Sequence, residues 1–532
     1  MINVLLLASS LLAIVASVVA HEWAPTGSRA RRVSFVLLLA GGVGLRLLAA
    51  RLDPYLNLWD EQFHALVAKN LISDPLRPTL YARPLLPFDV GDWTQNHVWL
   101  HKQPLFLWQI ALSLRVFGVN EFAVRLPSVV LATAVLAMIQ RVGTLTINSR
   151  AGFYAALLAA SGPFGLDLVS GHALTDHNDV AFLFYVAASL WAWFEMSRSR
   201  RWRWAVAVGA FAGLAVLVKW LTGLLVFAGW AVALIASRHD RRDPRSWGRL
   251  AMAFVLAVAV VLPWQIYILR AFPEEARREY AHTTRHLDAA LEGHQGDVWF
   301  HWRALRDLYG NSPLVPPLVA GSLLLLALRV QQRDRRAALV TWVVVTYAFF
   351  TTATTKMTAY CYPISPIVYL ALGATLEDAV RWLSRRADME KAWIVRTLAL
   401  SFVLVMVWSM TARELAWSHL DRKLEQKPYR AVRTHDAAII RRLSEILPPG
   451  RDWAVFNCRE HEGILVMFHT PYTGYHSVPT IQQLAILQAR GISVAVFDAP
   501  DLPEYVARNR DVFKIRPSVW DGRLGQVRRV TN

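Results

Sequence analysis

Apolar residues along this chain are gathered into runs of about 16–20 residues, and short connectors rich in arginine separate the runs. A helix needs about 20 mostly apolar residues to cross a hydrocarbon core roughly 30 Å thick. The pattern therefore predicts an α-helical polytopic membrane protein with about twelve transmembrane helices. The expected spans cover residues 2–20, 33–51, 127–143, 151–168, 179–196, 204–218, 221–237, 250–268, 313–330, 337–353, 363–379 and 393–412.

Two of the apolar runs have more than one interpretation. Residues 2–20 could form a cleaved signal peptide, but no basic residue precedes the apolar stretch, so we favour a retained span. Residues 104–117 are apolar but too few to cross a bilayer, and a crossing here would reverse the side of every later loop. We expect this segment to form a helix on the outer surface, where Trp108 suits the membrane interface.

Basic connectors predict the orientation, because Lys and Arg beside a span are retained in the cytoplasm. If the spans alternate in direction, all of these connectors lie on one side, which we expect to be cytoplasmic. They contain Arg29, Arg31, Arg32, Arg198, Arg200, Arg201, Arg203, Arg238, Arg241, Arg242, Arg245, Arg249, Arg333, Arg335, Arg336, Arg385, Arg386 and Lys391. The opposite face then receives residues 52–126, 169–178, 269–312, 354–362 and the tail of the chain.

The tail has the composition of an ordinary soluble domain. Residues 453–457 and 492–498 have the apolar pattern of buried strands, with helical patterns between and after them. We therefore expect a transmembrane domain over residues 1–412, with a long outer loop at 52–126. A small extracytoplasmic α/β domain, periplasmic if the chain is bacterial, is expected over residues 413–532.

Composition agrees with a membrane protein and narrows its partners. The chain has 532 residues, of which 55% are hydrophobic and 18% charged, and its mean hydropathy is +0.31. The net charge is +18, but the basic residues do not form one patch interleaved with aromatic residues, so we expect no nucleic-acid partner. Cys361 and Cys458 have no metal-ligand spacing, so neither a zinc site nor a disulfide framework is predicted.

Three outward segments carry candidate chemistry. Asp60 and Glu61 follow the second span, in Trp-Asp-Glu-Gln-Phe-His. They could take part in catalysis, or they could simply be polar residues at the membrane interface. Lys102, in His-Lys-Gln-Pro-Leu, could bind an anionic phosphate or anchor a lipid headgroup. Asp176 and Asp179 lie at the mouth of a later span, where acidic residues are costly and therefore favour a functional interpretation.

The order of these segments resembles the GT-C superfamily of integral membrane glycosyltransferases. The pattern comprises the acid pair, Lys-x-Pro-Leu before an amphipathic helix, Phe-Gly-Val-Asn-Glu-Phe-Ala-Val-Arg-Leu-Pro over 117–127, and the acidic second loop. Lys-Trp-Leu-Thr-Gly over 219–223 and Thr-Lys-Met-Thr-Ala-Tyr-Cys-Tyr-Pro over 355–363 agree with it. The likeness covers roughly residues 33–380 and is strongest to the branch of lipid A aminoarabinose transferases and protein O-mannosyltransferases.

The resemblance implies catalytic roles for the acidic residues. Asp60 would be the general base that accepts the proton of the acceptor hydroxyl, with Glu61 beside it. Asp176 best matches the acid of the second outer loop, and Asp179 is the alternative at that position.

The same resemblance implies that other residues bind the donor. Lys102 would hold the donor phosphate and stabilise negative charge on the leaving group, while Lys356 and Tyr360 would lie near the donor. The chain departs from the family where Lys-Pro-Pro, often preceded by Glu, is replaced by His101-Lys102-Gln103-Pro104. His101 and His294, together with an acid, could bind a divalent metal, although two isolated histidines are more often ordinary surface residues.

Together with the expected orientation, the resemblance implies an inverting glycosyltransferase at the outer face of a bacterial inner membrane. It would transfer a sugar from a polyprenyl-phosphate donor to a hydroxyl of lipid A, a protein, a glycan or another lipid. The sequence has no Gly-rich loop of the Walker or Rossmann kind, so it does not indicate that a nucleotide is required. No cofactor is predicted apart from the divalent metal considered above. The alternatives are a transporter or flippase, which predicts charges at mid-membrane and repeated halves, and a non-catalytic membrane receptor.

Overall fold

The computed structural model describes residues 2–23, 28–173, 176–291, 293–386, 427–458 and 462–515. The chain forms two compact units. The first comprises Met1–Leu52, Lys102–Phe106 and Leu126–Ser418, and the second comprises Asp53–His101, Leu107–Arg125 and His419–Asn532. Most of the long outer loop, residues 53–101 and 107–125, thus belongs to the same unit as the tail.

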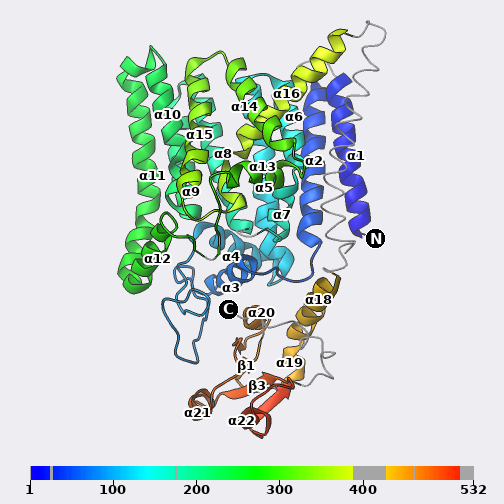
Figure 1. Ribbon diagram of the computed structural model, residues 1–532, viewed down its shortest axis with the longest axis vertical. Helices are drawn as coiled ribbons and strands as arrows, with labels where there is room; N and C mark the ends of the chain where they lie inside the picture. Colours follow the sequence, from blue (N-terminus) through cyan, green and yellow to red (C-terminus); the bar gives the residue numbers. More distant parts are fainter. Residues whose placement is uncertain are drawn as a thin grey trace. The chain divides into compact units, whose positions relative to one another are not determined.

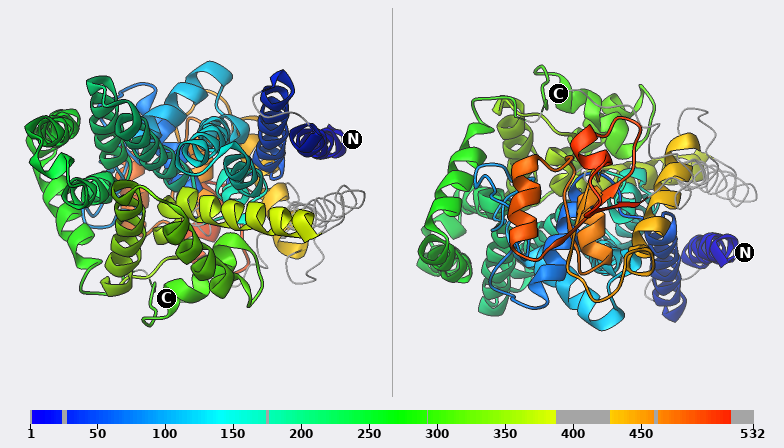
Figure 2. Two further views of the ribbon diagram at one scale, coloured as in Figure 1. Left: turned by 90° about the horizontal axis from the view of Figure 1, so that it is seen from above. Right: turned by 90° about the horizontal axis from the view of Figure 1, so that it is seen from below.

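The first unit is a bundle of α-helices (Figure 1; the left-hand view of Figure 2 looks along the helices). The helices are α1 (Ile2–Trp23), α2 (Arg29–Arg51), α5 (Glu121–Thr146), α6 (Ser149–Ala160), α7 (Pro163–Ser170), α8 (Asp176–Ser199), α9 (Trp202–Lys219), α10 (Leu225–Ala236), α11 (Pro244–Ala271), α12 (Pro273–Arg285), α13 (Phe300–Tyr309), α14 (Val315–Arg329), α15 (Arg333–Thr352) and α16 (Ser365–Arg386). Three short 3-10 helices, η1 (Trp220–Leu224), η2 (Asp240–Arg242) and η3 (Thr358–Ile364), occur in its connections.

The chain is a multi-span membrane protein, but the expected number of about twelve spans is not confirmed. Among the residues described, seven helices are long and apolar enough to cross a membrane, or up to eight if the bent pair α6–α7 is one span. Helix α14 has only 15 residues, and the expected span at 393–412 lies outside the described residues. The seven include α9 and α10 together as one apolar stretch, Trp202–Ala236. However, Arg200, before α9, pairs with Asp240, after α10, so the chain reverses direction between these two helices.

Small residues let α1 and α2 approach closely. A Cβ atom at Gly44 of α2 would lie 2.0 Å from Ser10 Oγ of α1, and one at Gly41 would lie 2.8 Å from the Ser10 carbonyl oxygen. Membrane helices associate through such small-residue contacts because lipid gives no hydrophobic drive for helix pairing. The apolar run near the start of the chain is therefore a packed helix of the bundle.

The bend of 47° between α6 and α7 is stabilised by an arginine of α2. The buried Arg46 guanidinium donates to the carbonyl oxygens of Ala159 and Ala160, each at 3.3 Å, and to that of Gly42 at 3.1 Å. A broken helix leaves carbonyl groups without intrahelical partners, and such groups are costly in a hydrocarbon environment. Arg46 supplies the missing donors.

Basic connectors meet at one end of the bundle, as their spacing predicted. Arg335 at the start of α15 donates to the Leu145 carbonyl oxygen near the end of α5 at 2.7 Å. Arg329 at the end of α14 pairs with Glu377 of α16 at 2.5 Å, and Asn148 before α6 reaches the same carboxylate at 3.2 Å. We name this the arginine-rich end of the bundle.

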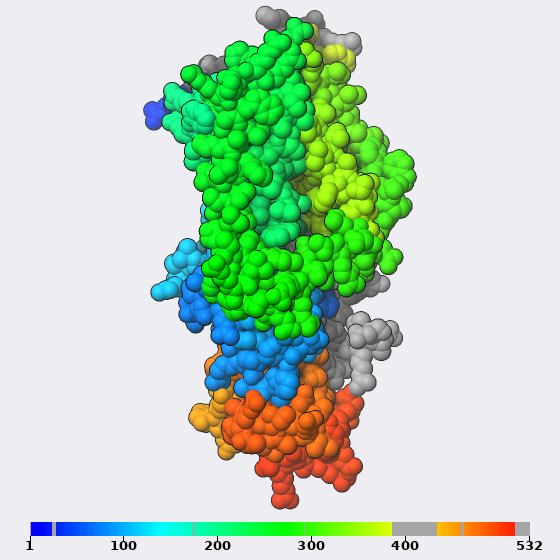
Figure 3. Space-filling view, turned by 90° about the vertical axis from the view of Figure 1, so that its left-hand side faces the viewer, coloured from blue at the N-terminus to red at the C-terminus, as the bar shows by residue number. Residues whose placement is uncertain are grey.

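Helix α11 presents apolar side chains outward. Phe254, Val255 and Leu262 are 44%, 65% and 46% exposed, respectively. Figure 3 shows the green segments that include α11 and α12 forming much of the surface of the first unit on that side. An exposed apolar helix surface of this kind is what lipid contact requires.

The second unit contains a four-stranded parallel sheet, shown in orange and red in the right-hand view of Figure 2. Its strands are β1 (Trp453–Phe456), β2 (Thr473–Gly474), β3 (Ser493–Phe497) and β4 (Val512–Ile515), in the order β2-β1-β3-β4. Its helices are α3 (Asp60–Leu71), most of α4 (Leu105–Phe117), α18 (Lys427–Arg441), α19 (Leu443–Ile446), α20 (Glu462–His469), α21 (Ile481–Ala489) and α22 (Glu504–Ala507). The expected small α/β fold of the tail is confirmed.

Residues of the outer loop complete the core of this sheet. Leu85 and Leu86 are buried in one cluster with β-strand and helix residues of the tail, namely Ala454, Phe456, Leu484, Leu487, Val494, Val496, Val506 and Val512. The Tyr81 hydroxyl donates to the Gly474 carbonyl oxygen at 3.2 Å, and Arg83 pairs with Asp452 at 2.8 Å. A parallel sheet must be covered on both faces, and the loop helps to cover one of them.

Candidate functional site

In the first unit, a buried ion pair lies at the bundle end opposite the arginine-rich end. Asp179 is in the first turn of α8 and Lys219 is the last residue of α9, and Lys219 Nζ lies 2.5 Å from Asp179 Oδ1. Asp179 is 2% exposed, whereas the Lys219 side chain is 23% exposed. The ammonium also lies 5.4 Å from the ring centroid of Tyr360, which is in η3. This cluster combines a carboxylate, a cation and an aromatic ring.

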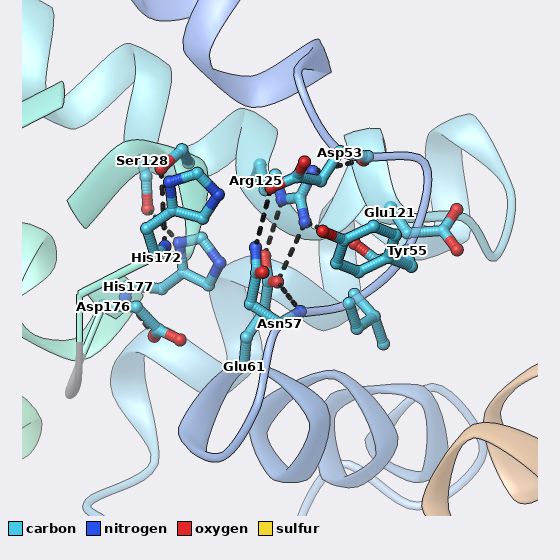
Figure 4. A network of polar contacts seen from close by, with 12 residues as sticks. Asp53, Tyr55, Asn57, Glu61, Glu121, Arg125, Ser128, His172, Asp176 and His177 are labelled. Carbon is cyan, nitrogen blue, oxygen red and sulfur yellow. Dashed lines mark hydrogen bonds and ion pairs between the residues drawn. The ribbon is translucent and has the colours of Figure 1, made fainter. Parts of the chain in front are cut away.

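Asp176 occupies the start of the same helix. Its carboxylate accepts from the backbone N–H of His177, and it is 1% exposed. The His177 ring Nδ1 in turn lies 2.8 Å from Ser128 Oγ, as Figure 4 shows. Asp176 and Asp179 are three residues apart at a helix N-terminus, where the helix dipole favours negative charge. Both candidate acids of the second loop are therefore buried at one helix start.

The turn after Lys219 has a constrained backbone. Trp220 has a φ of 62°, a conformation that costs a non-glycine residue about 1–3 kcal/mol. Gly223 permits a close approach, since a Cβ atom there would lie 2.5 Å from the Val216 backbone nitrogen. Strain of this kind persists only where the surroundings over-determine the conformation. The turn η1 thus fixes Lys219 at the end of α9.

A chain of side-chain contacts begins beside Lys102. Gln265 Nε2 of α11 donates to Gln103 Oε1 at 2.9 Å, and the Tyr280 hydroxyl of α12 donates to Gln265 Oε1 at 2.7 Å. Tyr280 stacks on Trp220, with ring centroids 5.4 Å apart and an interplanar angle of 24°. Burial raises the pKa of Tyr280 above its ordinary value, so its hydroxyl stays protonated as a donor.

Lys356 uses its ammonium to cap the end of α15. Its Nζ donates to the carbonyl oxygens of Thr351 at 2.5 Å, of Phe350 at 3.2 Å, and of Ala353. Cations are favourable at helix C-termini, where carbonyl groups lack partners. The geometry gives Lys356 a structural function close to Tyr360, and its predicted part in donor binding stays a prediction.

In the second unit, the adjacent acids Asp60 and Glu61 have different surroundings. Glu61 is fully buried and forms a bidentate pair with Arg125, at 2.6 Å to Nε and 2.9 Å to Nη2 (Figure 4). Its Oε2 also accepts from the Asn57 backbone N–H at 2.6 Å. Asp60, the first residue of α3, is only half-buried. Neighbouring helix residues point about 100° apart, so one acid anchors the structure while the other stays accessible.

Arg125 also fixes the loop that leads to Asp60. It is 0% exposed, and it donates to the carbonyl oxygens of Asp53 at 2.8 Å and Tyr55 at 2.7 Å, as Figure 4 shows. Charge-assisted, bidentate contacts of this kind are the strong class of protein hydrogen bond. The start of α3 is therefore held rigidly.

The other end of α3 is attached to α20. Lys69 Nζ donates to the carbonyl oxygens of Met467 at 2.6 Å and Thr470 at 3.2 Å, at the C-terminal end of α20. Burial lowers the pKa of Lys69 to about 8. The helix that carries Asp60 is thus held at both of its ends.

His101 belongs to an aromatic cluster in the second unit. Its ring stacks on Trp93 with centroids 4.4 Å apart and an interplanar angle of 5°, and meets the edge of Trp99 at 5.7 Å. Among the residues described, no three His, Cys, Asp or Glu side chains are grouped as metal ligands. His294, in the first unit, contributes its carbonyl oxygen to the Lys356 backbone N–H at 3.1 Å. The described residues therefore do not supply the donor set of the predicted metal site.

Sequence reasoning missed several of these residues. Lys219 and Arg125 were noted only as parts of longer motifs, and Gln265 and Tyr280 were not singled out. Arg125 could have been found, because a charged residue at the start of an apolar span is costly without a partner. Nothing in the local pattern around Gln265 or Tyr280 indicates their contacts.

Comparison with known proteins gives one family match and a group of relatives. The family model of dolichyl-phosphate-mannose-protein mannosyltransferases matches residues 101–267. The undecaprenyl phosphate-alpha-4-amino-4-deoxy-L-arabinose arabinosyl transferase of Pseudomonas savastanoi pv. phaseolicola is 27% identical over 354 residues, covering 63% of this chain and 61% of that protein. The Pseudomonas aeruginosa protein of the same name is 30% identical over 310 residues, covering 55% and 53%. The chain therefore spans between about half and three fifths of these relatives.

Solved structures share the fold. ArnT from Cupriavidus metallidurans in the apo state superposes with a TM-score of 0.62 at 17% identity, covering 89% of this chain and 94% of that one. The archaeal oligosaccharyltransferase AglB from Archaeoglobus fulgidus gives a TM-score of 0.56 at 12% identity, covering 88% and 70%. The chain thus has the GT-C fold, and its sequence is similar to that of the aminoarabinose transferases named above.

Proposed function

We propose that this protein is an inverting glycosyltransferase that moves a sugar from a polyprenyl-phosphate donor to a hydroxyl acceptor. The observation that carries the proposal is the cluster of Asp179, Lys219 and Tyr360 at the bundle end opposite the arginine-rich end. Relatives named for undecaprenyl-phosphate aminoarabinose transfer support the donor class. No observation favours a transporter.

The proposed reaction is a direct displacement at the anomeric carbon. The acceptor hydroxyl oxygen forms the new bond to that carbon, the bond from the carbon to the phosphate oxygen breaks, and polyprenyl phosphate leaves. Asp60 receives the hydroxyl proton, since it is the accessible member of the acid pair. Lys102 binds the phosphate and stabilises the charge that develops on it.

Lys219 and Asp179 prepare the first unit for an anionic ligand. The buried Asp179 carboxylate holds Lys219 in place, and the partial exposure of the lysine side chain leaves it able to contact a ligand. The Tyr360 ring below the ammonium adds cation–π attraction, worth about 0.5–2 kcal/mol. Glu61 and Arg125 act as positioning residues, because their hydrogen bonds fix the loop before Asp60.

The test is transfer of radiolabelled sugar from a panel of polyprenyl-phosphate donors to membrane acceptors by the purified protein. We expect transfer by wild type and its loss in Asp60→Ala and Lys102→Ala. The matched controls Asp452→Ala and Lys514→Ala remove the same groups elsewhere and should retain transfer. Donors that are never turned over, or site variants that match wild type, would contradict the proposal.

We further propose that the active site faces the periplasm of a bacterial inner membrane. The gathering of arginines at the other end of the bundle supports this orientation. Gln295 and Gln331 are both exposed, and Gln331 lies in the connector between α14 and α15. In intact spheroplasts, a membrane-impermeant maleimide should label Gln295→Cys and spare Gln331→Cys. The reverse labelling would overturn the orientation.

A further inference from the structure

We propose that Gln103 is a positioning residue for donor binding, which it performs by hydrogen-bonding to Gln265 and, through it, to Tyr280. The inference rests on the proposed function and adds to it. Gln103 directly follows Lys102, at the place where the chain departs from the Lys-Pro-Pro order of the family it resembles. The structure gives this departure a partner, since Gln265 Nε2 donates to Gln103 Oε1 at 2.9 Å.

The amide of Gln265 is used at both of its ends. Its nitrogen donates to Gln103, and its oxygen accepts from the Tyr280 hydroxyl at 2.7 Å. Gln265 is only 8% exposed, so water competes little for these bonds. Successive hydrogen bonds in one direction polarise each other, and a buried amide left unpaired costs about 1–3 kcal/mol. Gln103 is therefore fixed against α11.

The chain of contacts continues to the second lysine. Tyr280 stacks on Trp220 at 5.4 Å, and Trp220 directly follows Lys219, the partner of Asp179. Trp220 also has the constrained φ of 62°, so movement of its ring is coupled to the backbone beside Lys219. The residues next to Lys102 and Lys219 are thus connected through side chains of α11 and α12.

This arrangement has a consequence for the donor. An ammonium group on a flexible four-carbon stem loses conformational entropy when it binds a phosphate. The hydrogen bond of the next residue, Gln103, holds the point from which the lysine stem extends, so that only the stem itself is ordered when the ligand binds. Gln103 therefore acts on binding of the phosphate more than on the chemical step.

The experiment measures donor binding separately from turnover. Gln103→Leu, Gln265→Leu and the double variant are compared with wild type, using undecaprenyl phosphate alone as the titrant and a polyprenyl-phosphate sugar for kinetics. Each single variant should raise the Kd of undecaprenyl phosphate and the KM of the donor roughly 3- to 10-fold, the value of one hydrogen bond, with little change in kcat. The double variant should be no weaker than the worse single variant, because both changes break the same bond.

Two further variants separate positioning from stability. Gln265→Met has nearly the length of glutamine but can neither donate to Gln103 nor accept from Tyr280, so it should weaken binding at least as much as Gln103→Leu does. Gln140→Leu removes an amide that donates to Thr144 at 3.3 Å elsewhere in the bundle, and it should leave Kd and KM unchanged. If a leucine variant does not fold, Gln265→Met carries the test.

Three results would overturn the inference: unchanged Kd and KM in the single variants, strictly additive effects in the double variant, or a fall in kcat alone. A fall in thermal stability without a change in Kd would also contradict the inference, because it would mean that Gln103 only stabilises the fold. If wild type itself neither binds undecaprenyl phosphate nor transfers sugar, the proposed function fails instead, so the two failures are distinguishable.

Discussion

The two compact units each contain a buried ion pair, and the pairs differ in what surrounds them. In the second unit, the side chains of Glu61 and Arg125 are both 0% exposed, and backbone groups occupy their remaining hydrogen-bonding positions. In the bundle, Asp179 is buried, but the Lys219 side chain is 23% exposed and has an aromatic ring nearby. The first pair is saturated and can only hold the structure. The second keeps a cation that can still meet a ligand.

The largest effect should come from separating the two adjacent acids of the second unit. Asp60→Asn should reduce the transfer rate about 10²- to 10⁴-fold, the usual value of a general base, with thermal stability unchanged. Glu61→Gln should instead lower the thermal stability, because the amide cannot replace the charge that faces Arg125. Initial rates and melting temperatures of the two purified variants distinguish the loss of activity from the loss of stability. An equal loss of activity with equal stability would show that the acids share one function.

The saturated pair should be costly to break and nearly neutral to replace. Arg125→Met leaves the Glu61 charge buried and unpaired, and should destabilise the protein by about 3–5 kcal/mol. The double variant Arg125→Met with Glu61→Leu should recover most of this loss. Arg83→Met, at a pair whose side chains are 63% and 38% exposed, is the control and should cost about 0–1 kcal/mol. Denaturant unfolding followed by near-UV circular dichroism measures all three.

The contribution of the outer loop to the second unit can be tested with leucines. Leu86→Ala should cost about 2–5 kcal/mol, as truncation in a packed core does, because Leu86 is 7% exposed within the core of the parallel sheet. Leu76→Ala, in the same loop but 51% exposed, should change stability by less than about 0.5 kcal/mol. Equal effects of the two substitutions would mean that the loop does not depend on the sheet for its structure.

The smallest effect concerns pH at the arginine-rich end. Burial alone raises the pKa of Asp240, but hydrogen bonds from Arg200 and Ser237 outweigh it and lower the value to about 2. A free aspartate has a pKa of about 3.9, so the stabilisation is complete well above that pH and is lost as the pH falls towards the folded-state pKa of about 2. Wild type should therefore exceed Asp240→Asn in stability by about 1 kcal/mol at pH 6, and by much less at pH 2.5. A stability difference that does not depend on pH would show that the ion pair of Arg200 and Asp240 does not stabilise the protein.

The helices were predictable because their signal is local. Apolar runs and the residues that end them are read within one segment, and eleven of the twelve expected runs fall on helices in the part of the chain described here. Strands β1 and β3 of the tail followed from the same kind of pattern. The order of the acids and Lys102 along the chain was also enough to indicate the fold that the solved structures share.

Contacts between distant segments could not be predicted. Nothing near Leu85 or Leu86 shows that they complete a sheet formed by the tail, and Gln103 lies 162 residues before its partner Gln265. Adjacent acids such as Asp60 and Glu61 look equivalent in a sequence, because their difference is made by Arg125, which lies 64 residues after Glu61. Packing, not local pattern, assigns these roles.

Arg46 has a bearing on how the chain is built into a membrane. The carbonyl groups at the end of α6 face a break in the helix, and the donors that satisfy them belong to α2, which is synthesised more than a hundred residues earlier. A nascent α6–α7 segment alone in lipid would expose those carbonyls at a cost of several kcal/mol each. Because α2 is synthesised first, Arg46 is already in the membrane when the bent α6–α7 segment is inserted, and it can donate to those carbonyl groups at once.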